Sequence, residues 1–223
     1  KQGLRTSATR AVLDAPDYQF EPPTDGLDPR ALARKLGEAL PKGALFTAGA
    51  GHFFSFIGMY SPLPEGGEIQ YSYGFGAVGQ GIGVAIGTGA GNPGRPHVAV
   101  EGDGSLMFNL QELETVVRHK VQMVLVVWND CGYGAEVHKL VAKGFNEKLA
   151  QWKSPDFVAL ARAFGGDGVL LKDPAAIGDA IADGLRKGGL YLIDARVSPS
   201  TPTDPYAKVH FGRESHAPLL RPA

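Results

Sequence analysis

The sequence contains a single cysteine, Cys131, and no apolar run that approaches the length of a membrane-spanning helix. One cysteine excludes an intramolecular disulfide framework and is typical of a cytoplasmic protein. The formal net charge of −1 provides no basic surface for nucleic acid or for an anionic membrane. The chain begins with neither an initiator methionine nor a signal peptide, so we expect part of a longer protein or a processed subunit.

A strand-helix-strand pattern occupies the middle of the chain. Residues 97–100 and 122–128 are β-branched, apolar runs bounded by turn residues, and between them apolar residues recur at helical spacing from Leu106 to Val117. Such a unit joins parallel strands by a right-handed crossover. Because parallel strands end at the same sheet edge, where open α/β sheets bind ligands, we expect the carboxylates of Asp103 and Asp130 to lie side by side.

The motif Gly102-Asp103-Gly104-Ser105 follows the first of these strands. Its glycines permit a tight turn and a close backbone approach, and Ser105 can cap the next helix, whose free N–H groups favour a phosphate. Two carboxylates beside a phosphate site indicate magnesium, which prefers hard oxygen ligands. A purely structural strand-to-helix turn is the alternative interpretation.

The rest of the chain continues this alternation of helices and strands. We predict helices over 30–40, 78–89, 135–140, 157–164 and 174–187, and strands over 45–47, 68–73, 168–171 and 190–197. The sequence therefore predicts an α/β fold, a doubly wound, mostly parallel sheet of about six strands with helices on both faces.

Proline-rich segments flank this region. Residues 1–28 are expected to be a linker from a preceding domain, 29–197 the ligand-binding domain and 198–223 a C-terminal extension, with Asp28 capping the first helix. Residues 141–153 are polar and irregular, which favours either a mobile cover over the site or a plain surface connection.

A competing motif occurs at residues 74–79, which read Gly-x-Gly-x-x-Gly between a predicted strand and a predicted helix. Glu101 falls about twenty residues further on, where the ribose-binding acid of a dinucleotide site would lie. This pattern favours a nicotinamide or flavin site, but it leaves the motif after residue 128 unexplained.

That second motif is Asn129-Asp130-Cys131-Gly132-Tyr133-Gly134. With it, the chain resembles the thiamine-diphosphate enzymes, whose signature is Gly-Asp-Gly, a spacer of this length, and a strand ending in Asn-Asn or Asn-Asp. Residues 30–197 resemble the C-terminal diphosphate-binding (PP) domain of the acetolactate synthase, pyruvate decarboxylase and benzoylformate decarboxylase group. The resemblance implies thiamine diphosphate and Mg²⁺ as cofactors and a 2-oxo acid as substrate. FAD is possible but cannot be read from this chain, since the family's flavin lies mainly on the middle domain.

The resemblance also implies site residues. The Mg²⁺ ligands would be the side chains of Asp103 and Asp130 and the carbonyl of Gly132, although Asp130 departs from the commoner Asn and adds a negative charge. Val78 would be the apolar wedge that bends the cofactor, or else a helix-packing residue. The cofactor-binding positions implied are Ala50, Gly51, His52, Phe53, Gly76, Val78, Gly104, Ser105, Tyr133, Gly134 and Ala135.

Two residues are candidates for catalysis. Glu136 occupies the position of a glutamate that pyruvate decarboxylase-like enzymes use beside the bound intermediate, where acetolactate synthases carry an apolar residue. A carboxyl group there can protonate the intermediate and release an aldehyde, so Glu136 favours a decarboxylase over an acetolactate synthase-like carboligase; a solvated helix-surface glutamate is the alternative. His52 can relay protons near neutral pH or be structural, and His138 is expected to point elsewhere.

The family's essential glutamate lies on a pyrimidine-binding domain, which this sequence does not contain. We therefore expect an N-terminal portion or a separate chain to complete the site, in a homodimer or tetramer without nucleic-acid or membrane partners. A non-catalytic subunit that holds thiamine diphosphate without turnover is an alternative of another class.

Overall fold

The computed structural model describes residues 22–72, 74–203, 206–207 and 212. Most of the expected linker, Tyr73 at the end of a predicted strand, and most of the expected C-terminal extension lie outside the described residues. Residues 23–201 form one compact unit around a six-stranded sheet. The strands are β1 (Leu45–Ala48), β2 (Glu68–Tyr71), β3 (His97–Gly102), β4 (Met123–Asn129), β5 (Asp167–Leu171) and β6 (Leu190–Arg196).

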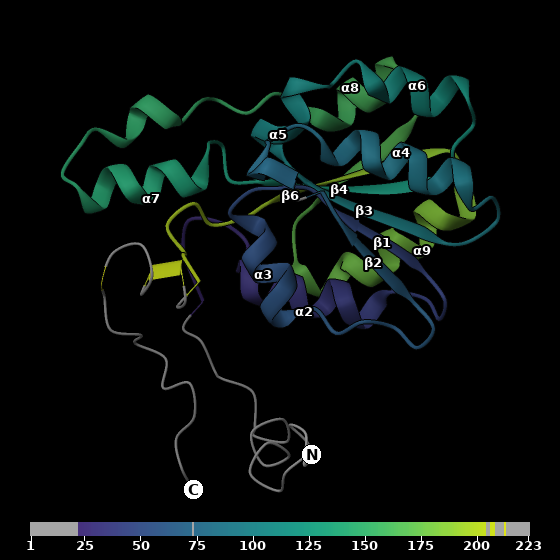
Figure 1. Cartoon of the computed structure of the whole chain (residues 1–223), viewed down its shortest axis with the longest axis horizontal. Coiled ribbons are helices and arrows are strands. Elements are labelled where there is room, and N and C mark those ends of the chain that lie inside the picture. The colour runs from purple at the N-terminus through teal and green to yellow at the C-terminus, as the bar shows by residue number, and fades with distance from the viewer. Residues whose placement is uncertain (1–21, 73, 204–205, 208–211, 213–223) are drawn as a thin grey trace, which may run out of the picture. The chain divides into compact units, whose positions relative to one another are not determined.

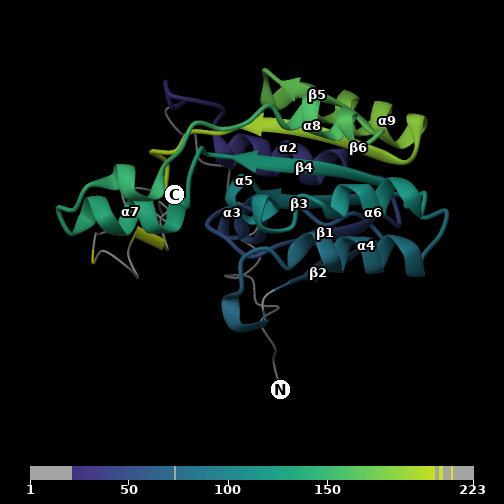
Figure 2. The ribbon, with the colours of Figure 1, turned by 90° about the horizontal axis from the view of Figure 1, so that it is seen from above.

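All strand pairings in this sheet are parallel, and the spatial order is β2-β1-β3-β4-β6-β5. Helices cover both faces of the sheet, as Figures 1 and 2 show. One face carries α2 (Pro29–Ala39), α3 (Phe53–Tyr60) and α9 (Ile177–Lys187); the other carries α4 (Gly81–Gly91), α5 (Asp103–Phe108), α6 (Glu112–Arg118) and α8 (Phe157–Ala163). The expected doubly wound α/β fold is confirmed.

The central strand β4 is buried along its whole length because both of its faces are covered. Val124 and Val126 pack with α2, α3 and α9, whereas Leu125 and Val127 pack with the helices of the opposite face. A strand buried on both sides reads as a continuous apolar run, which is why its position was visible in the sequence.

Three local features differ from the prediction. The helix expected over 106–117 is two helices, α5 and α6, with a turn at Asn109 between them. The helix expected from Val78 begins only at Gly81, since Gly79 has a left-handed φ of 94° that an α-helix cannot contain. Helix α3 was not predicted at all.

The segment after β4 forms α7 (Gly134–Ala142) and the 3-10 helix η2 (Glu147–Ala150) at the carboxyl edge of the sheet. In Figure 1, α7 lies to the left, beyond the ends of the strands. Two short 3-10 helices, η1 (Gly74–Gly76) and η3 (Pro174–Ala176), precede α4 and α9. Asp28 caps α2 as predicted, because its side chain accepts from the N–H of Arg30 at 2.9 Å.

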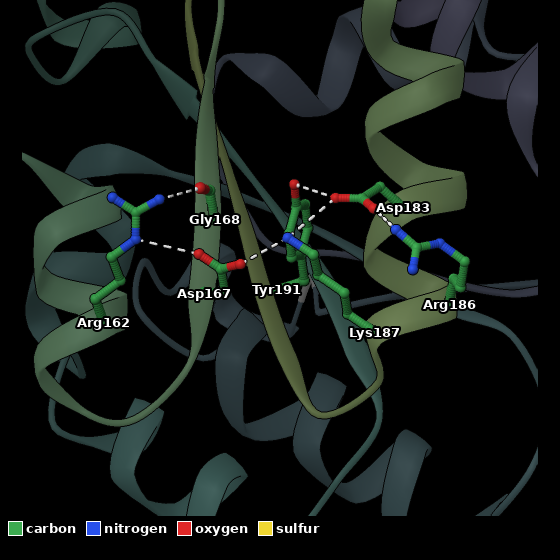
Figure 3. A network of polar contacts seen from close by, with 7 residues as sticks. All are labelled: Arg162, Asp167, Gly168, Asp183, Arg186, Lys187 and Tyr191. Atoms are coloured by element: carbon green, nitrogen blue, oxygen red, sulfur yellow. Dashed lines mark hydrogen bonds and ion pairs between the residues drawn. The ribbon is translucent and has the colours of Figure 1, made fainter.

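A polar network fastens the opposite, amino edge of β5 and β6 (Figure 3). The Asp167 carboxylate accepts from Arg162 of α8 at 3.1 Å and from Lys187 of α9 at 2.7 Å, and Asp183 accepts from the Tyr191 hydroxyl at 3.0 Å. The charge-assisted hydrogen bonds, above all that of Lys187, lower the pKa of Asp167 to about 2. Among the described residues, no helix is both long and apolar enough to cross a membrane.

Candidate functional site

The turns that follow β1, β3 and β4 meet at the carboxyl edge of the sheet and line one cleft. Register places Gly102 of β3 opposite Trp128 of β4, so Asp103 and Asp130 leave adjacent strand ends. The cleft is lined by Ala50, Gly51, His52, Phe53, Val78, Gly102, Asp103, Gly104, Ser105, Trp128, Asp130, Gly132, Tyr133, Gly134, Ala135 and Glu136. Every residue proposed from the sequence is among them except Gly76, which the structure places outside the lining.

The two aspartates form an acidic pair in which Asp103 is buried and Asp130 is partly buried. Burial raises the pKa of Asp103 to about 6. Burial and the neighbouring Asp103 carboxylate raise the pKa of Asp130 well above its usual range. Neither carboxylate oxygen of Asp103 accepts a hydrogen bond of normal geometry within the part of the chain that the structure describes. A cation between these carboxylates would remove their repulsion and satisfy their oxygens.

Glycine allows aromatic rings to close over the first motif. A Cβ at Gly104 would lie 2.7 Å from Tyr133 Cε1 and 2.8 Å from Trp152 Cη2. The two rings contact each other edge to face, with centroids 4.7 Å apart. Glycine is therefore required at position 104 because a side chain would block the approach of these rings, and not because the backbone φ is unusual.

Ser105 does not cap a helix, so that prediction is wrong. Helix α5 begins two residues earlier, at Asp103, and the residue at its N-cap is Gly102. The Ser105 Oγ instead accepts from the N–H of Gly79 at 2.8 Å. The hydroxyl proton of Ser105 can still be donated to a ligand oxygen, since the bond to Gly79 uses only a lone pair.

The side chain of Asn129 fixes the shape of the second motif through three hydrogen bonds. Its Nδ2 donates to Asp194 Oδ1 and to Ser154 Oγ, both at 2.8 Å, and its Oδ1 accepts from the N–H of Cys131 at 3.3 Å. Cys131 adopts a left-handed φ of 59°, which turns the chain sharply at the strand end. The asparagine is therefore a structural residue that presents Asp130 and Gly132 to the cleft.

The segment over 141–153 is more ordered than expected. It contains the end of α7 and the helix η2, and it folds back on the second motif. The N–H of Tyr133 donates to the Ala150 carbonyl at 2.9 Å, and the N–H of Trp152 donates to the Cys131 carbonyl at 3.0 Å. These bonds hold Trp152 over Gly104. The mobility of this segment as a cover stays a prediction.

The acid-base candidates lie on two sides of the cleft. The Glu136 side chain is 56% exposed and lies 3.6 Å from the Lys139 ammonium. Burial, and to a smaller extent the charge of His138, lowers the pKa of His52 to about 3. This imidazole is therefore neutral at pH 7. The expectation that it titrates near neutral pH is wrong. His138 is not part of the cleft lining, in agreement with the expectation that it points elsewhere on the helix than Glu136, but its ring lies 4.7 Å from that of His52.

Glu101 argues against the dinucleotide interpretation. Its side chain is 1% exposed, and burial raises its pKa to about 7. The carboxylate fills the space that Cβ atoms on Gly49 and Gly81 would occupy, so it cannot reach a ribose in solvent.

Sequence patterns missed His138, Trp152 and Asn109, whose roles depend on contacts between distant turns.

The fold and the cleft define an α/β domain that binds its ligand at the carboxyl edge of a parallel sheet. Residues 49–195, more than half of the chain, match the family described as thiamine pyrophosphate enzyme, C-terminal TPP binding domain. The chain therefore belongs to the thiamine diphosphate (thiamine pyrophosphate) enzymes, whose C-terminal cofactor-binding domain it matches, and this confirms the resemblance to that family.

Known relatives are much longer than this chain. The acetolactate synthase of Bacillus subtilis (strain 168) is 28% identical over 177 residues, which cover 79% of this chain and 31% of that protein. The sulfoacetaldehyde acetyltransferase of Castellaniella defragrans is 27% identical over 171 residues, 76% of this chain and 28% of that protein. This chain thus spans about a third of the length of these relatives.

The fold is shared with a solved enzyme structure. The thiamine diphosphate-dependent 4-hydroxybenzoylformate decarboxylase of Rhodococcus jostii RHA1 superposes with a TM-score of 0.70 at 23% sequence identity. The match covers 82% of this chain and 35% of that one.

Proposed function

We infer that this chain supplies the diphosphate- and Mg²⁺-binding part of an active site that uses thiamine diphosphate to act on a 2-oxo acid. The observation that carries this proposal is the pair of neighbouring carboxylates of Asp103, which is buried, and Asp130, which is partly buried. None of the described residues that line their cleft is a lysine or an arginine. A diphosphate can approach two carboxylates only with a cation between them, and Mg²⁺ is usually held by one or two carboxylates plus phosphate oxygens.

The side chains present fit this cofactor. Asp103 has two buried oxygens available as ligands, and Asp130 and the carbonyl of Gly132 would complete the protein's share of the coordination. The N–H of Gly104 and the hydroxyl of Ser105 would bind diphosphate oxygens. The turn over 50–53 would border the other side of the diphosphate, and Tyr133, Gly134 and Ala135 would border the metal.

The thiamine ring would rest against Val78, whose apolar side chain lines the cleft and is 40% exposed. A β-branched side chain has few rotamers, so it makes a stiff support. Gly76 lies outside the cleft lining, and the cleft geometry therefore adds no support for its proposed contact with the aminopyrimidine.

Bound thiamine diphosphate supplies the carbon nucleophile through which a 2-oxo acid loses CO₂. Glu136, which lines the cleft, would supply a carboxyl group beside the reacting carbon, and this favours decarboxylation with aldehyde release. His52 is neutral and buried, and its lowered pKa makes it a poor proton acceptor, so it suits a hydrogen-bonding role. Carboligation is the second candidate, favoured by the likeness to acetolactate synthase.

A pyrimidine-binding domain, from another segment or another chain, would complete the site in a homodimer or tetramer in the cytoplasm. Apolar side chains near the cleft support such a partner. Phe75 is fully exposed, and Met107 and Phe108 also leave large apolar surfaces in contact with solvent. Clustered exposed apolar groups commonly mark a protein interface.

Calorimetric titration of thiamine diphosphate, with and without Mg²⁺, into the native assembly that contains this chain tests the proposal. We expect Mg²⁺-dependent binding that Asp103→Ala abolishes. Asp179→Ala, which removes an exposed aspartate on α9, is the matched control and should bind as the native chain does.

The same assembly, supplied with a panel of 2-oxo acids, should release CO₂, and Glu136→Gln should slow aldehyde formation. Absence of binding in an assembly shown to contain the pyrimidine-binding domain would refute the assignment. Binding without any CO₂ release would instead favour the non-catalytic subunit.

A further inference from the structure

Both main-chain polar groups of Gly79 are hydrogen-bonded to residues at the two ends of the segment 105–109. Its N–H donates to Ser105 Oγ at 2.8 Å, and its carbonyl accepts from Asn109 Nδ2 at 2.7 Å. Ser105 lies in α5, and Asn109 is the residue that ends this helix. The two successive peptide units that flank the Gly79 Cα, just before α4, are thus bonded to one short helix and to the residue that ends it.

The fit at Gly79 leaves no room for a side chain. Its φ is 94°, a conformation that L side chains rarely adopt. A Cβ there would lie 2.8 Å from Phe108 Cβ and 3.2 Å from Asn109 Nδ2. The loop over 74–79 is therefore pressed directly against the end of α5, and the two hydrogen bonds fix its position.

The orientation of the Asn109 amide follows from its partner. A carbonyl oxygen only accepts hydrogen bonds, so the amide must present its NH₂ group to Gly79. The amide oxygen of Asn109 then faces the Gln111 side chain, whose Nε2 lies 3.5 Å away. The predicted long helix breaks at this residue, whose φ of −134° and ψ of 34° are not helical.

Both ends of this connection reach the cleft. Val78 precedes Gly79 and lines the cleft, while Ser105 lines it from the Gly-Asp-Gly turn. We propose that Ser105, Gly79 and Asn109 form a clamp that couples the diphosphate turn to the wedge Val78, with Asn109 as a positioning residue for cofactor binding. The proposal rests on the proposed function, because its ligand is thiamine diphosphate.

The clamp has a consequence for binding. A ligand that orders the turn over 102–105 should also order Val78, since Ser105 accepts a hydrogen bond from the peptide that joins Val78 to Gly79. Loss of the Asn109 donor should loosen the loop over 74–80 without touching the carboxylates that would hold Mg²⁺. One neutral hydrogen bond corresponds to a factor of about two to ten in an equilibrium.

Amide hydrogen exchange of the segment 74–80, followed by mass spectrometry without added cofactor, measures the clamp itself. Asn109→Ala and the equally sized Asn109→Asp, which lacks the donor, should exchange about two- to tenfold faster there than the native chain. The matched control is Asn92→Ala, which removes an asparagine that donates to a main-chain carbonyl, Thr88 O, at 2.9 Å at the other end of α4. It should leave exchange over 74–80 unchanged.

Titration of thiamine diphosphate with Mg²⁺ into the native assembly measures the coupling. We expect the dissociation constant to rise by about the same two- to tenfold in the Asn109 variants, and the near-ultraviolet circular dichroism of the bound cofactor to change. Unchanged exchange over 74–80 in both variants would overturn the clamp. Faster exchange with native affinity and native dichroism would overturn its role in binding.

These failures are distinguishable from failure of the proposed function. If the native assembly binds no thiamine diphosphate, the proposed function fails and the coupling falls with it. The exchange result would still report whether Asn109 holds the loop.

Discussion

His97 allows a prediction of acid sensitivity that can be worked through from the structure. It is the first residue of β3, it has no exposed surface, and its Nε2 lies 3.1 Å from Thr47 Oγ1 of β1. Its Nδ1 has no hydrogen-bond partner among the described residues. Burial without a compensating charge lowers the pKa of His97 from 6.5 to about 4.

The sign follows from proton linkage. Between these two pKa values the unfolded chain binds a proton at residue 97 that the folded chain does not, so acid favours unfolding. The stability contribution is complete above the unfolded pKa and is lost as the pH falls towards the folded one. At about pH 5 the loss from this one group amounts to about 2 kcal/mol, out of a total of about 3 kcal/mol.

Urea unfolding of the native chain and of His97→Gln at a series of pH values measures this contribution. The free energy of unfolding of the native chain should fall relative to that of the variant by about 2 kcal/mol between about pH 7.5 and about pH 5. Other titrating groups cancel in this difference. His119→Gln, which replaces an exposed histidine, should keep the native pH dependence. A constant difference between the native chain and His97→Gln would refute the reasoning.

Two further substitutions test packing and charge. Gly104→Ala places a Cβ 2.7 Å from the Tyr133 ring, so it should cost about 1–3 kcal/mol of unfolding free energy and weaken thiamine diphosphate binding. The control Gly83→Ala lies on an exposed helix face with open space around it and should stabilise by about 0.5–1 kcal/mol. Lys187→Met removes the 2.7 Å bond to Asp167, both partly exposed, and should lower Tm slightly in low salt but not in high salt.

The architecture was predictable because it depends on local patterns. Fully buried β3 and β4 read as apolar runs, and the glycine motifs that follow them mark the sheet edge where ligands bind. The pair Asp28-Pro29 correctly predicted the start of α2. Each of these signals lies within a few neighbouring residues, so it can be recognised from a single sequence.

The errors arose where tertiary contacts override local preference. The stretch from Leu106 to Val117 has an unbroken helical period, yet the helix ends at Asn109, whose backbone is not helical and whose side chain donates to the Gly79 carbonyl, 30 residues away. In the sequence, His52 precedes the second motif and His138 follows it. Their rings come into contact only because the segments that follow β1 and β4 lie at the same edge of the sheet. No period or spacing in the chain reports such contacts.

The acidic pair destabilises the folded state, which is unexpected for a turn with only a structural role. A buried carboxylate without a matched cation opposes folding, and a second carboxylate beside it adds repulsion. An amide oxygen at position 130 could accept the same backbone hydrogen bond from Gly132 without that charge, and Asn129 makes further hydrogen bonds that shape the turn. The cost is recovered only when a cation binds the folded state, because ligand binding stabilises the state that binds it. Asp130 is therefore better explained by a divalent cation in the cleft than by the architecture of the sheet edge.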